Sequence, residues 1–215
     1  MHTTLNINNY KHVIWDWNGT LLNDIDLVIN AVNATLTSRD MTPITKEKYL
    51  QLFDFPVIAF YEQLGFDYSK ESFDDHSTEY HVAYDKGWRD CQLAHGVDKL
   101  LNYSKANNIS QSILSASPQW MLDACVDHFN LAHYFNTLVG QDNDNAHGKI
   151  ETGIAWVKQC DIHPKEMIFI GDTVHDYEVA QALGTDCVLV TTGHHPYEKL
   201  KKCDTMIVDS VEALL

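Results

Sequence analysis

Short apolar segments alternate with longer amphipathic segments over most of this chain. Segments this short and this rich in β-branched residues predict buried strands, and they lie at 12–16, 112–115, 137–140, 167–171, 187–190 and 205–208. Between the later ones, apolar residues recur with helical spacing at 97–106, 119–129, 150–160 and 176–183, and Gly184 follows where a helix cap belongs. Strands alternating with helices of this length predict a mainly parallel sheet with right-handed crossovers.

One long region interrupts the alternation. Between residues 23 and 95 no segment has a convincing strand pattern, and helical patterns run over 25–36, 46–53, 57–64 and 73–88. A segment of this length is too long for a loop inside a compact domain. We therefore expect an inserted helical subdomain that sits over the sheet.

Composition narrows the classes of protein that the chain can represent. It has 215 residues, 45% of them hydrophobic, which is enough for one core and a small satellite domain. Its 15 basic and 30 acidic residues give a net charge of −15, which is opposite to the balance of a nucleic-acid-binding protein. No nucleic-acid partner is expected, and the sequence makes no prediction of oligomeric state.

Cysteine usage and the N-terminal segment bear on the compartment. The five cysteines are odd in number, widely spaced and without a CxxC pair, which argues against a disulfide framework or a zinc site. The N-terminal residues lack the apolar core of a signal peptide, and no apolar stretch approaches the length needed to cross a membrane. We expect a cytoplasmic protein with free thiols and no membrane partner.

Polar residues with chemical potential follow three of the predicted strands. Asp16, Ser115 and Asp172 stand at the strand ends, and Lys149 lies in the connection after the strand that ends at Gly140. Because the carboxyl ends of parallel strands meet at one edge of a sheet, where open α/β proteins bind ligands, these side chains are expected to converge. Carboxylates at such an edge suit magnesium, and a hydroxyl beside backbone N–H groups suits phosphate.

Each of these residues also has a purely structural interpretation. Asp16 and Asp172 can cap the turns that follow their strands, and Ser115 can cap the helix that Pro118 opens. Lys149 can be an ordinary surface lysine, although it begins a helix, where the macrodipole disfavours a cation and an anionic partner would relieve the misfit. The coincidence of several strand ends is more informative than any single position.

Taken together, the motifs resemble those of a known family. A strand followed by Asp16-x-Asn18-Gly19-Thr20, a strand ending at Ser115, then Lys149, then a strand followed by Gly171-Asp172-Thr173-x-x-Asp176 is similar to the haloacid dehalogenase superfamily. The likeness is greatest to its capped phosphatases, such as phosphoglycolate phosphatases. It implies a Rossmann-like, mainly parallel sheet with helices on both faces. Residues 1–21 and 93–215 would form this core, and residues 22–92 would form a helical cap.

The resemblance also implies a role for each motif residue. Asp16 would be the nucleophile that becomes an aspartyl-phosphate, and Mg²⁺ would be held by Asp16, the backbone carbonyl of Asn18 and Asp172. Thr173 and Asp176 would support this set, with Asp176 orienting a metal-bound water or Lys149. The phosphoryl oxygens of a small phosphorylated substrate would be bound by a further group of residues: Gly19, Thr20, Ser115, Ala116 and Lys149.

Asn18 departs from the family pattern, which usually has an aspartate there that protonates the leaving oxygen and later activates water. An amide can do neither, although its backbone carbonyl can still bind a metal. Two alternatives therefore accompany the phosphatase prediction. One is a carbon–phosphorus hydrolase that uses a cap lysine as a Schiff base, and the other is a non-catalytic phosphate-binding relative. The four cap lysines are Lys46, Lys48, Lys70 and Lys86.

Two further groups of side chains lie near the predicted site. Aromatic residues of the predicted cap, among them Phe55, Tyr61, Tyr84 and Trp88, could face a substrate but are read as core residues. His175, His194 and His195 could lie at the active edge of the sheet and are read as surface or capping residues. The identity of the substrate does not follow from the sequence.

Overall fold

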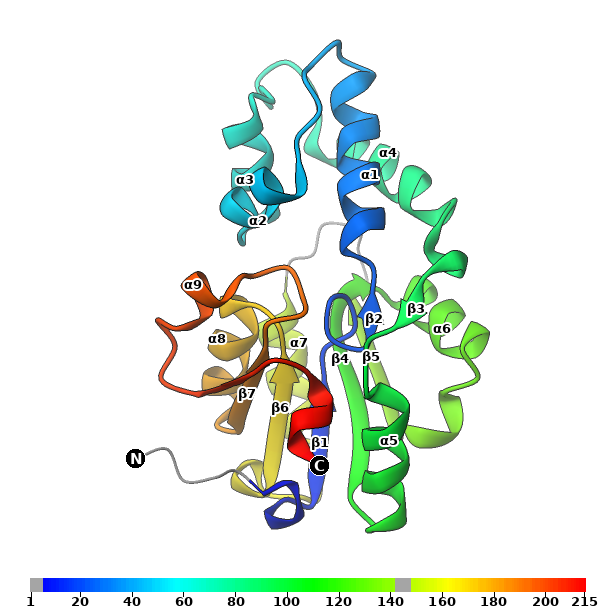
Figure 1. Ribbon diagram of the computed structural model, residues 1–215, viewed down its shortest axis with the longest axis vertical. Coiled ribbons are helices and arrows are strands. Elements are labelled where there is room, and N and C mark those ends of the chain that lie inside the picture. The colour runs from blue at the N-terminus through cyan, green and yellow to red at the C-terminus, as the bar shows by residue number, and fades with distance from the viewer. Residues whose placement is uncertain (1–5, 142–147) are drawn as a thin grey trace.

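The computed structural model describes residues 6–141 and 148–215, and a six-stranded sheet forms its centre (Figure 1). The strand order is β5-β4-β1-β6-β7-β8, and every neighbouring pair is parallel. The strands are β1 (His12–Trp15), β4 (Ser110–Pro118), β5 (Thr137–Gln141), β6 (Met167–Gly171), β7 (Asp186–Val190) and β8 (Met206–Val208). Strands β4 and β5 lie on one side of β1, and β6, β7 and β8 lie on the other side. The direction in which successive strands are added therefore reverses at β1, and ligands bind at such a switch point in parallel sheets.

Helices cover both faces of the sheet, because side chains alternate along each buried strand. In β1, Val13 and Trp15 pack on the face covered by α5 (Val97–Ala106) and α6 (Gln119–His128), whereas Ile14 packs on the other face. That second face is covered by α7 (Lys149–Val157) and α8 (Val174–Leu183). The expected Rossmann-like core is confirmed.

Four further helices stand above the carboxyl ends of the strands (Figure 1). They are α1 (Ile25–Thr37), α2 (Lys46–Leu52), α3 (Val57–Leu64) and α4 (Phe73–Asp85), and their apolar side chains are continuous with the core on the α5 and α6 face. The inserted helical cap is therefore confirmed. At its base, β2 (Leu22–Asn23) pairs antiparallel with β3 (Gln92–Leu93). Two-residue strands are too short to show alternation, which is why no sequence pattern predicted them; the domain limits at 22 and 92 remain a prediction.

Most predicted elements agree with the structure to within a few residues. Gly184 adopts a left-handed φ of 76° at the end of α8, as its position predicted. β4 extends to Pro118, well past the predicted end at residue 115. Several short elements lacked a sequence pattern: α9 (Tyr197–Leu200) and the 3-10 turns Ile7–Asn9, Trp88–Asp90, Ala132–Tyr134, Pro164–Glu166 and Val211–Leu214.

Two further findings concern the cysteines and the character of the helices. All five cysteines are free thiols in the structure, as expected. Within residues 6–141 and 148–215, no helix combines the length and the apolar character that a bilayer crossing requires.

Candidate active site

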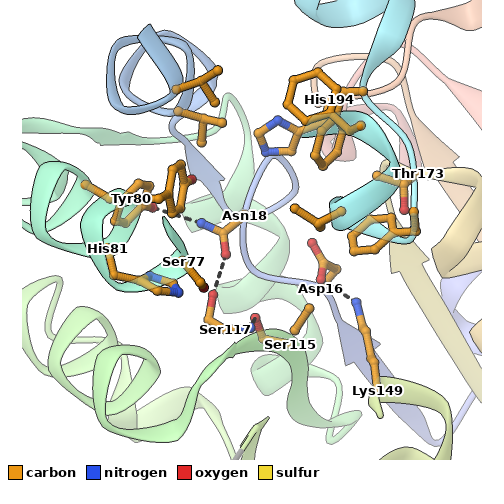
Figure 2. Close-up of a pocket in the computed structure, with 18 of the residues that line it drawn as sticks. Asp16, Asn18, Ser77, Tyr80, His81, Ser115, Ser117, Lys149, Thr173 and His194 are labelled. Atoms are coloured by element: carbon orange, nitrogen blue, oxygen red, sulfur yellow. Dashed lines mark hydrogen bonds and ion pairs between the residues drawn. The ribbon is translucent and has the colours of Figure 1, made fainter. Parts of the chain in front are cut away.

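The predicted chemical residues meet in one cavity at the carboxyl edge of the sheet (Figure 2). Asp16 directly follows β1, Ser115 lies in β4, and Asp172 directly follows β6. Lys149 is the first residue of α7, which follows β5. These four positions are far apart in the sequence. They meet because the carboxyl ends of parallel strands lie at the same edge of the sheet.

Lys149 lies between two carboxylates at the bottom of this cavity. Its Nζ is 2.5 Å from Asp16 Oδ1 and 2.7 Å from Asp176 Oδ1, and its side chain is 2% exposed. Burial alone would lower the pKa of Lys149, but the two carboxylates outweigh burial and raise that pKa above its ordinary value. A lysine at the start of a helix was expected to need an anionic partner, because the helix dipole disfavours a cation there. The protein itself supplies this partner in the carboxylates of Asp16 and Asp176.

Three carboxylates crowd around this single ammonium. Oxygen atoms of Asp16, Asp172 and Asp176 all lie within 4.8 Å of one another, and all three residues are buried. Burial raises the pKa of Asp172 to about 6, and the neighbouring Asp176 charge adds to the shift. Burial also raises the pKa of Asp16, aided by the charges of Asp176 and Asp172 and opposed by Lys149. A divalent cation would relieve this repulsion, and carboxylates are the ligands that hard cations prefer.

Asp172 is held in place by groups from two other loops. Thr20 Oγ1 donates to Asp172 Oδ1 at 2.8 Å, and the backbone N–H of His194 donates to Asp172 Oδ2 at 2.6 Å. A Cβ on Gly193 would lie 2.1 Å from Asp172 Oδ2, and a Cβ on Gly19, whose φ is +75°, would lie 2.5 Å from the same atom. Only glycine lets both loops approach the carboxylate so closely.

Asp176 is fixed by the start of α8. Its Oδ2 accepts hydrogen bonds from the backbone N–H groups of Asp172 and Thr173 and from the hydroxyl of Thr173, which completes a reciprocal capping box. Burial alone would raise the pKa of Asp176, but Lys149 outweighs burial and lowers it. The lowered pKa favours the carboxylate form of Asp176, which contacts the Lys149 ammonium.

Ser115 does not cap a helix, because β4 continues to Pro118 and α6 begins at Gln119. Its hydroxyl instead accepts a hydrogen bond from the N–H of Ser117 at 3.0 Å. The Ser115 carbonyl accepts from Gln141 Nε2 at 3.0 Å, which ties the end of β4 to β5. Ser115 and Ala116 line the cavity, whereas Gly19 and Thr20 are not among the described residues that line it.

The Asn18 side chain is held as an amide by three partners. Its Nδ2 donates to Asp24 Oδ2 at 2.7 Å and to Tyr84 OH at 2.8 Å, and its Oδ1 accepts from Ser117 Oγ at 2.7 Å. Figure 2 shows this side chain beside Asp16, with a dashed line to Ser117. Because the Asp24 carboxylate can only accept when ionised, it requires a donor at residue 18, which an ionised aspartate would not supply.

Asp24 is a functional candidate that sequence reasoning missed, and His194 is one that it weighed but read as a surface or capping residue. Asp24 precedes α1 and is 1% exposed; besides Asn18, it accepts hydrogen bonds from the N–H of Gly19 and from Tyr84 OH. His194 Nε2 lies 3.5 Å from Asp24 Oδ1, and its Nδ1 lies 2.9 Å from Tyr49 OH on the cap helix α2. Burial alone would lower the pKa of His194, but Asp24 and Asp172 raise it to about 9, so this imidazole is a cation at neutral pH.

The expectation that these histidines are surface or capping residues was wrong for His194, whereas His195 is buried but does cap a helix. His194 is 5% and His195 0% exposed, since both follow β7 and enter the carboxyl edge of the sheet. The capping role is correct for His195, whose Nδ1 accepts from the N–H of Val174 at 3.0 Å at the start of α8. A Gly-His-His sequence after another buried strand was the available signal for these residues.

The cap aromatics divide between the core and the cavity. Phe55, Tyr61 and Tyr84 line the cavity, so the reading of these three as core residues was incomplete. Trp88 is 2% exposed and packs within the apolar core, as expected. Helical spacing shows that an aromatic residue faces inward, but a core and a cavity both lie inward.

The sequence matches the haloacid dehalogenase-like hydrolase family over residues 13–190. The chain belongs to this family. One relative, phosphoglycolate phosphatase 1 of Pseudomonas aeruginosa, is 23% identical over 211 residues, which cover 94% of this chain and 78% of the relative.

Solved structures share the fold. A predicted phosphatase from Clostridium acetobutylicum superposes with a TM-score of 0.83 at 23% identity, covering 95% of this chain and 96% of the other. Protein tyrosine kinase A of Mycobacterium tuberculosis gives a TM-score of 0.80 at 18% identity, covering 95% and 96%. The comparisons confirm the resemblance found in the sequence, the fold and the hydrolase class, and they align the chain with the family's phosphatases.

Proposed function

We propose that this protein is a magnesium-dependent phosphomonoester hydrolase that acts on a small phosphorylated molecule through an aspartyl-phosphate on Asp16. The arrangement of Asp16, Asp172 and Asp176 around Lys149 carries the proposal. In one cavity it combines the nucleophile Asp16, carboxylates that can bind a cation, and the ammonium of Lys149. A cytoplasmic location and a small-molecule substrate are part of the same proposal, which is supported by the phosphatase relatives.

The residues fit a bound Mg²⁺. Asp16, Asp172 and the backbone carbonyl of Asn18 would hold it, and two of these three donors are buried carboxylates whose pKa values are raised first by burial and further by neighbouring carboxylates. When bound, the ion would neutralise charge on the phosphoryl oxygens and lower the repulsion between phosphate and carboxylates. Thr20 and the N–H of His194 would keep Asp172 oriented toward it.

Asp16 would attack the phosphorus atom directly. A bond forms between an Asp16 carboxylate oxygen and phosphorus while the bond from phosphorus to the ester oxygen breaks, and the leaving oxygen departs as an anion that takes its proton from water. Water then attacks the aspartyl-phosphate, which releases inorganic phosphate and restores Asp16. One Asp16 oxygen pairs with Lys149, which holds the carboxylate in a fixed orientation for this attack.

Lys149, Ser115 and backbone N–H groups near Ala116 would bind the phosphoryl oxygens as charge develops on them. Lys149 is suited to this because Asp176, 2.7 Å away, holds its ammonium in place beside Asp16. Thr20 is proposed to act on Asp172 rather than on substrate, since its hydroxyl already donates to that carboxylate. Gly19 would contribute through its missing side chain, which lets its loop approach the Asp172 carboxylate closely.

The carbon–phosphorus alternative has less support. The four cap lysines considered for a Schiff base are exposed, and they are not among the described residues that line the cavity: Lys46, Lys48, Lys70 and Lys86. A non-catalytic relative is the other alternative, and Asn18 is the observation that favours it. Turnover decides between that class and the enzyme.

The test is phosphate release from 4-nitrophenyl phosphate by the purified protein. We expect release that depends on Mg²⁺ and stops in excess chelator. The Asp16→Asn variant should lose it, whereas Asp127→Asn, a matched change at an exposed position on α6, should retain it. Full activity in chelator or in Asp16→Asn would refute the proposal, and absence of turnover with magnesium would favour the non-catalytic class.

A further inference from the structure

The cavity above Asp16 is walled mainly by apolar side chains of the cap. Representatives from α1, α3 and α4 are Val28, Val32, Val57, Phe60, Phe73 and Tyr80. The whole cavity, including its polar floor at Asp16 and Lys149, has a volume of about 150 Å³, and an apolar cavity of this size accommodates a benzene ring. Figure 2 shows Tyr80 and His81 of α4 on the opposite side of Asn18 from Lys149. The leaving group of a substrate bound at Asp16 would therefore extend into an apolar chamber.

Lys149 and the protonated His194 of this cavity both already face carboxylates. Lys149 contacts Asp16 and Asp176, and the His194 imidazole lies between Tyr49 and Asp24. No arginine and no lysine of the cap is among the described residues that line the chamber.

Arg39, a cation within the cap, is paired away from the chamber. Its guanidinium lies 2.8 Å from Glu71 and 2.8 Å from Glu79. A carboxylate on the leaving group would meet no lysine or arginine among the described cap residues of the chamber walls, whose polar groups are hydroxyls and the His81 imidazole. Placing an unpaired charge against apolar walls is costly, because the charge loses its hydration without compensation.

Asn18 points to the same kind of leaving group. An amide that donates to Asp24 and Tyr84 cannot also protonate a departing oxygen. Departure without protonation is easier for a phenol, with a pKa of about 10, than for an aliphatic alcohol, whose pKa is closer to the value of about 16 for water. The pocket lining and the residue at position 18 are independent observations that agree.

We propose that the substrate is a phosphate monoester of an uncharged aromatic alcohol, whose ring occupies the apolar chamber while its phosphate lies at Asp16. This inference rests on the proposed phosphatase function and names its substrate class. It disfavours a small hydroxy acid phosphate as the preferred substrate, because the described cap residues that line the mainly apolar chamber include no lysine or arginine to pair with the carboxylate of such a molecule.

A matched pair of esters tests the inference. The first is 4-propylphenyl phosphate, and the second is 3-(4-phosphonooxyphenyl)propanoate, in which a carboxylate replaces the terminal methyl group. Two methylenes insulate the phenol from that carboxylate, so the two leaving groups have nearly the same pKa. At pH 7 with Mg²⁺ we expect kcat/KM to favour the propyl ester by about 100-fold, because a buried charge without a partner costs this much or more. Equal rates, or a preference for the carboxylate, would overturn the inference.

A variant at the chamber wall provides a second readout. Val57 is half-buried and begins α3, so a longer side chain there reaches the chamber from its rim. Val57→Lys should narrow the preference between the two esters at least tenfold, and Val57→Met, which is long but uncharged, should leave it unchanged. Narrowing to the same extent in both variants would show that size rather than charge sets the preference, contrary to the inference.

Binding separates failure of this inference from failure of the phosphatase proposal. Calorimetric titration of Asp16→Asn with each ester, in the presence of Mg²⁺, measures chamber preference without turnover. Selective binding of the propyl ester with no turnover by the wild type would refute the phosphatase function and retain the chamber assignment. Turnover of both esters at equal kcat/KM would retain the phosphatase function and refute the chamber assignment.

Discussion

Replacing Asn18 by aspartate tests the chemistry at the position where this chain departs from its family. The Asn18 amide nitrogen lies 2.7 Å from Asp24 Oδ2, so the substitution sets two carboxylates against each other in a buried site. At an effective dielectric constant of about 20, two unit charges at this separation repel by about 6 kcal/mol. That energy raises the pKa of one carboxyl by about 4, which keeps a proton on the pair near neutral pH.

The proton retained by the pair gives Asn18→Asp an acid that the wild type lacks. We expect the variant to raise kcat/KM for alkyl phosphates by about 10²–10⁴-fold, the usual contribution of a positioned acid. Aryl phosphates should gain much less, because phenolates leave without help. Steady-state kinetics with a series of esters of increasing leaving-group pKa measures both effects, and the wild type should show the steeper dependence.

The same repulsion predicts a stability cost with a definite pH dependence. In the unfolded variant the new carboxyl has a pKa of about 3.9, so holding it protonated at pH 7 costs about 4 kcal/mol of folding stability. Because the folded pKa is raised above the unfolded one, this cost shrinks as the pH falls toward 4 and grows as the pH rises. Urea unfolding at pH 5 and pH 7.5 should show the variant approaching the wild type only at the lower pH.

The comparison requires wild-type protein whose residue 18 is still an amide. Asn18 precedes Gly19, and attack of a glycine nitrogen on the preceding amide converts asparagine slowly to aspartate. In the structure the Gly19 N–H donates to Leu22 O and to Asp24 Oδ1, both at 2.9 Å, which holds this nitrogen away from the reaction. Peptide mass spectrometry verifies the amide. If amide-containing wild type hydrolyses alkyl phosphates as fast as Asn18→Asp, another group is the acid and the reasoning on Asn18 is refuted.

The buried titratable groups and the contact between cap and core support three more predictions. The half-saturating Mg²⁺ concentration should rise about tenfold between pH 7 and pH 5, because protons compete for Asp172, whose pKa of about 6 lies between these values; a flat profile would contradict Asp172 as a ligand. Burial lowers the pKa of His12 to about 4 from 6.5, so the unfolded chain binds more protons in this window and stability falls as the pH drops through it. Unfolding free energies at pH 7 and pH 5 should differ by about 1 to 2 kcal/mol less in His12→Gln than in the wild type, and an unchanged difference would show that His12 does not titrate as described. Tyr49→Phe removes the hydroxyl that contacts His194 and should raise KM about three- to tenfold with little change in kcat, since one hydrogen bond of about 1 kcal/mol between cap and core is lost; an equal loss in kcat would place Tyr49 in the chemical step.

Much of the fold follows from local sequence patterns. The buried segment ending at Asp16 has the short apolar pattern of a parallel strand, and the helices of the inserted region showed their 3.6-residue spacing clearly enough for α3 to be predicted without error in its bounds. Gly184 marks the end of α8 because a left-handed cap favours glycine. These features depend on neighbours within a few residues, which the sequence contains directly.

The motif residues could also be grouped at one edge of the sheet from the sequence alone, because parallel strands place their carboxyl ends together. Asp16, Ser115, Lys149, Asp172 and Asp176 do converge there. The sequence did not show that Asp24, Tyr84 and Ser117 surround the Asn18 amide, or that His194 turns inward between Asp24 and Tyr49. It also could not separate aromatics that fill the core from those that line the chamber.

The difference has a physical origin. Strands, helices and caps are fixed by interactions between residues close in sequence, so hydrophobic period and turn chemistry determine them. The surroundings of Asn18 depend on the docking of the cap on the sheet, which brings Tyr84 within 2.8 Å of a residue 66 positions earlier. That docking is set by the packing of many side chains across the whole chain, so only the tertiary structure decides which polar groups meet and which charges share a partner.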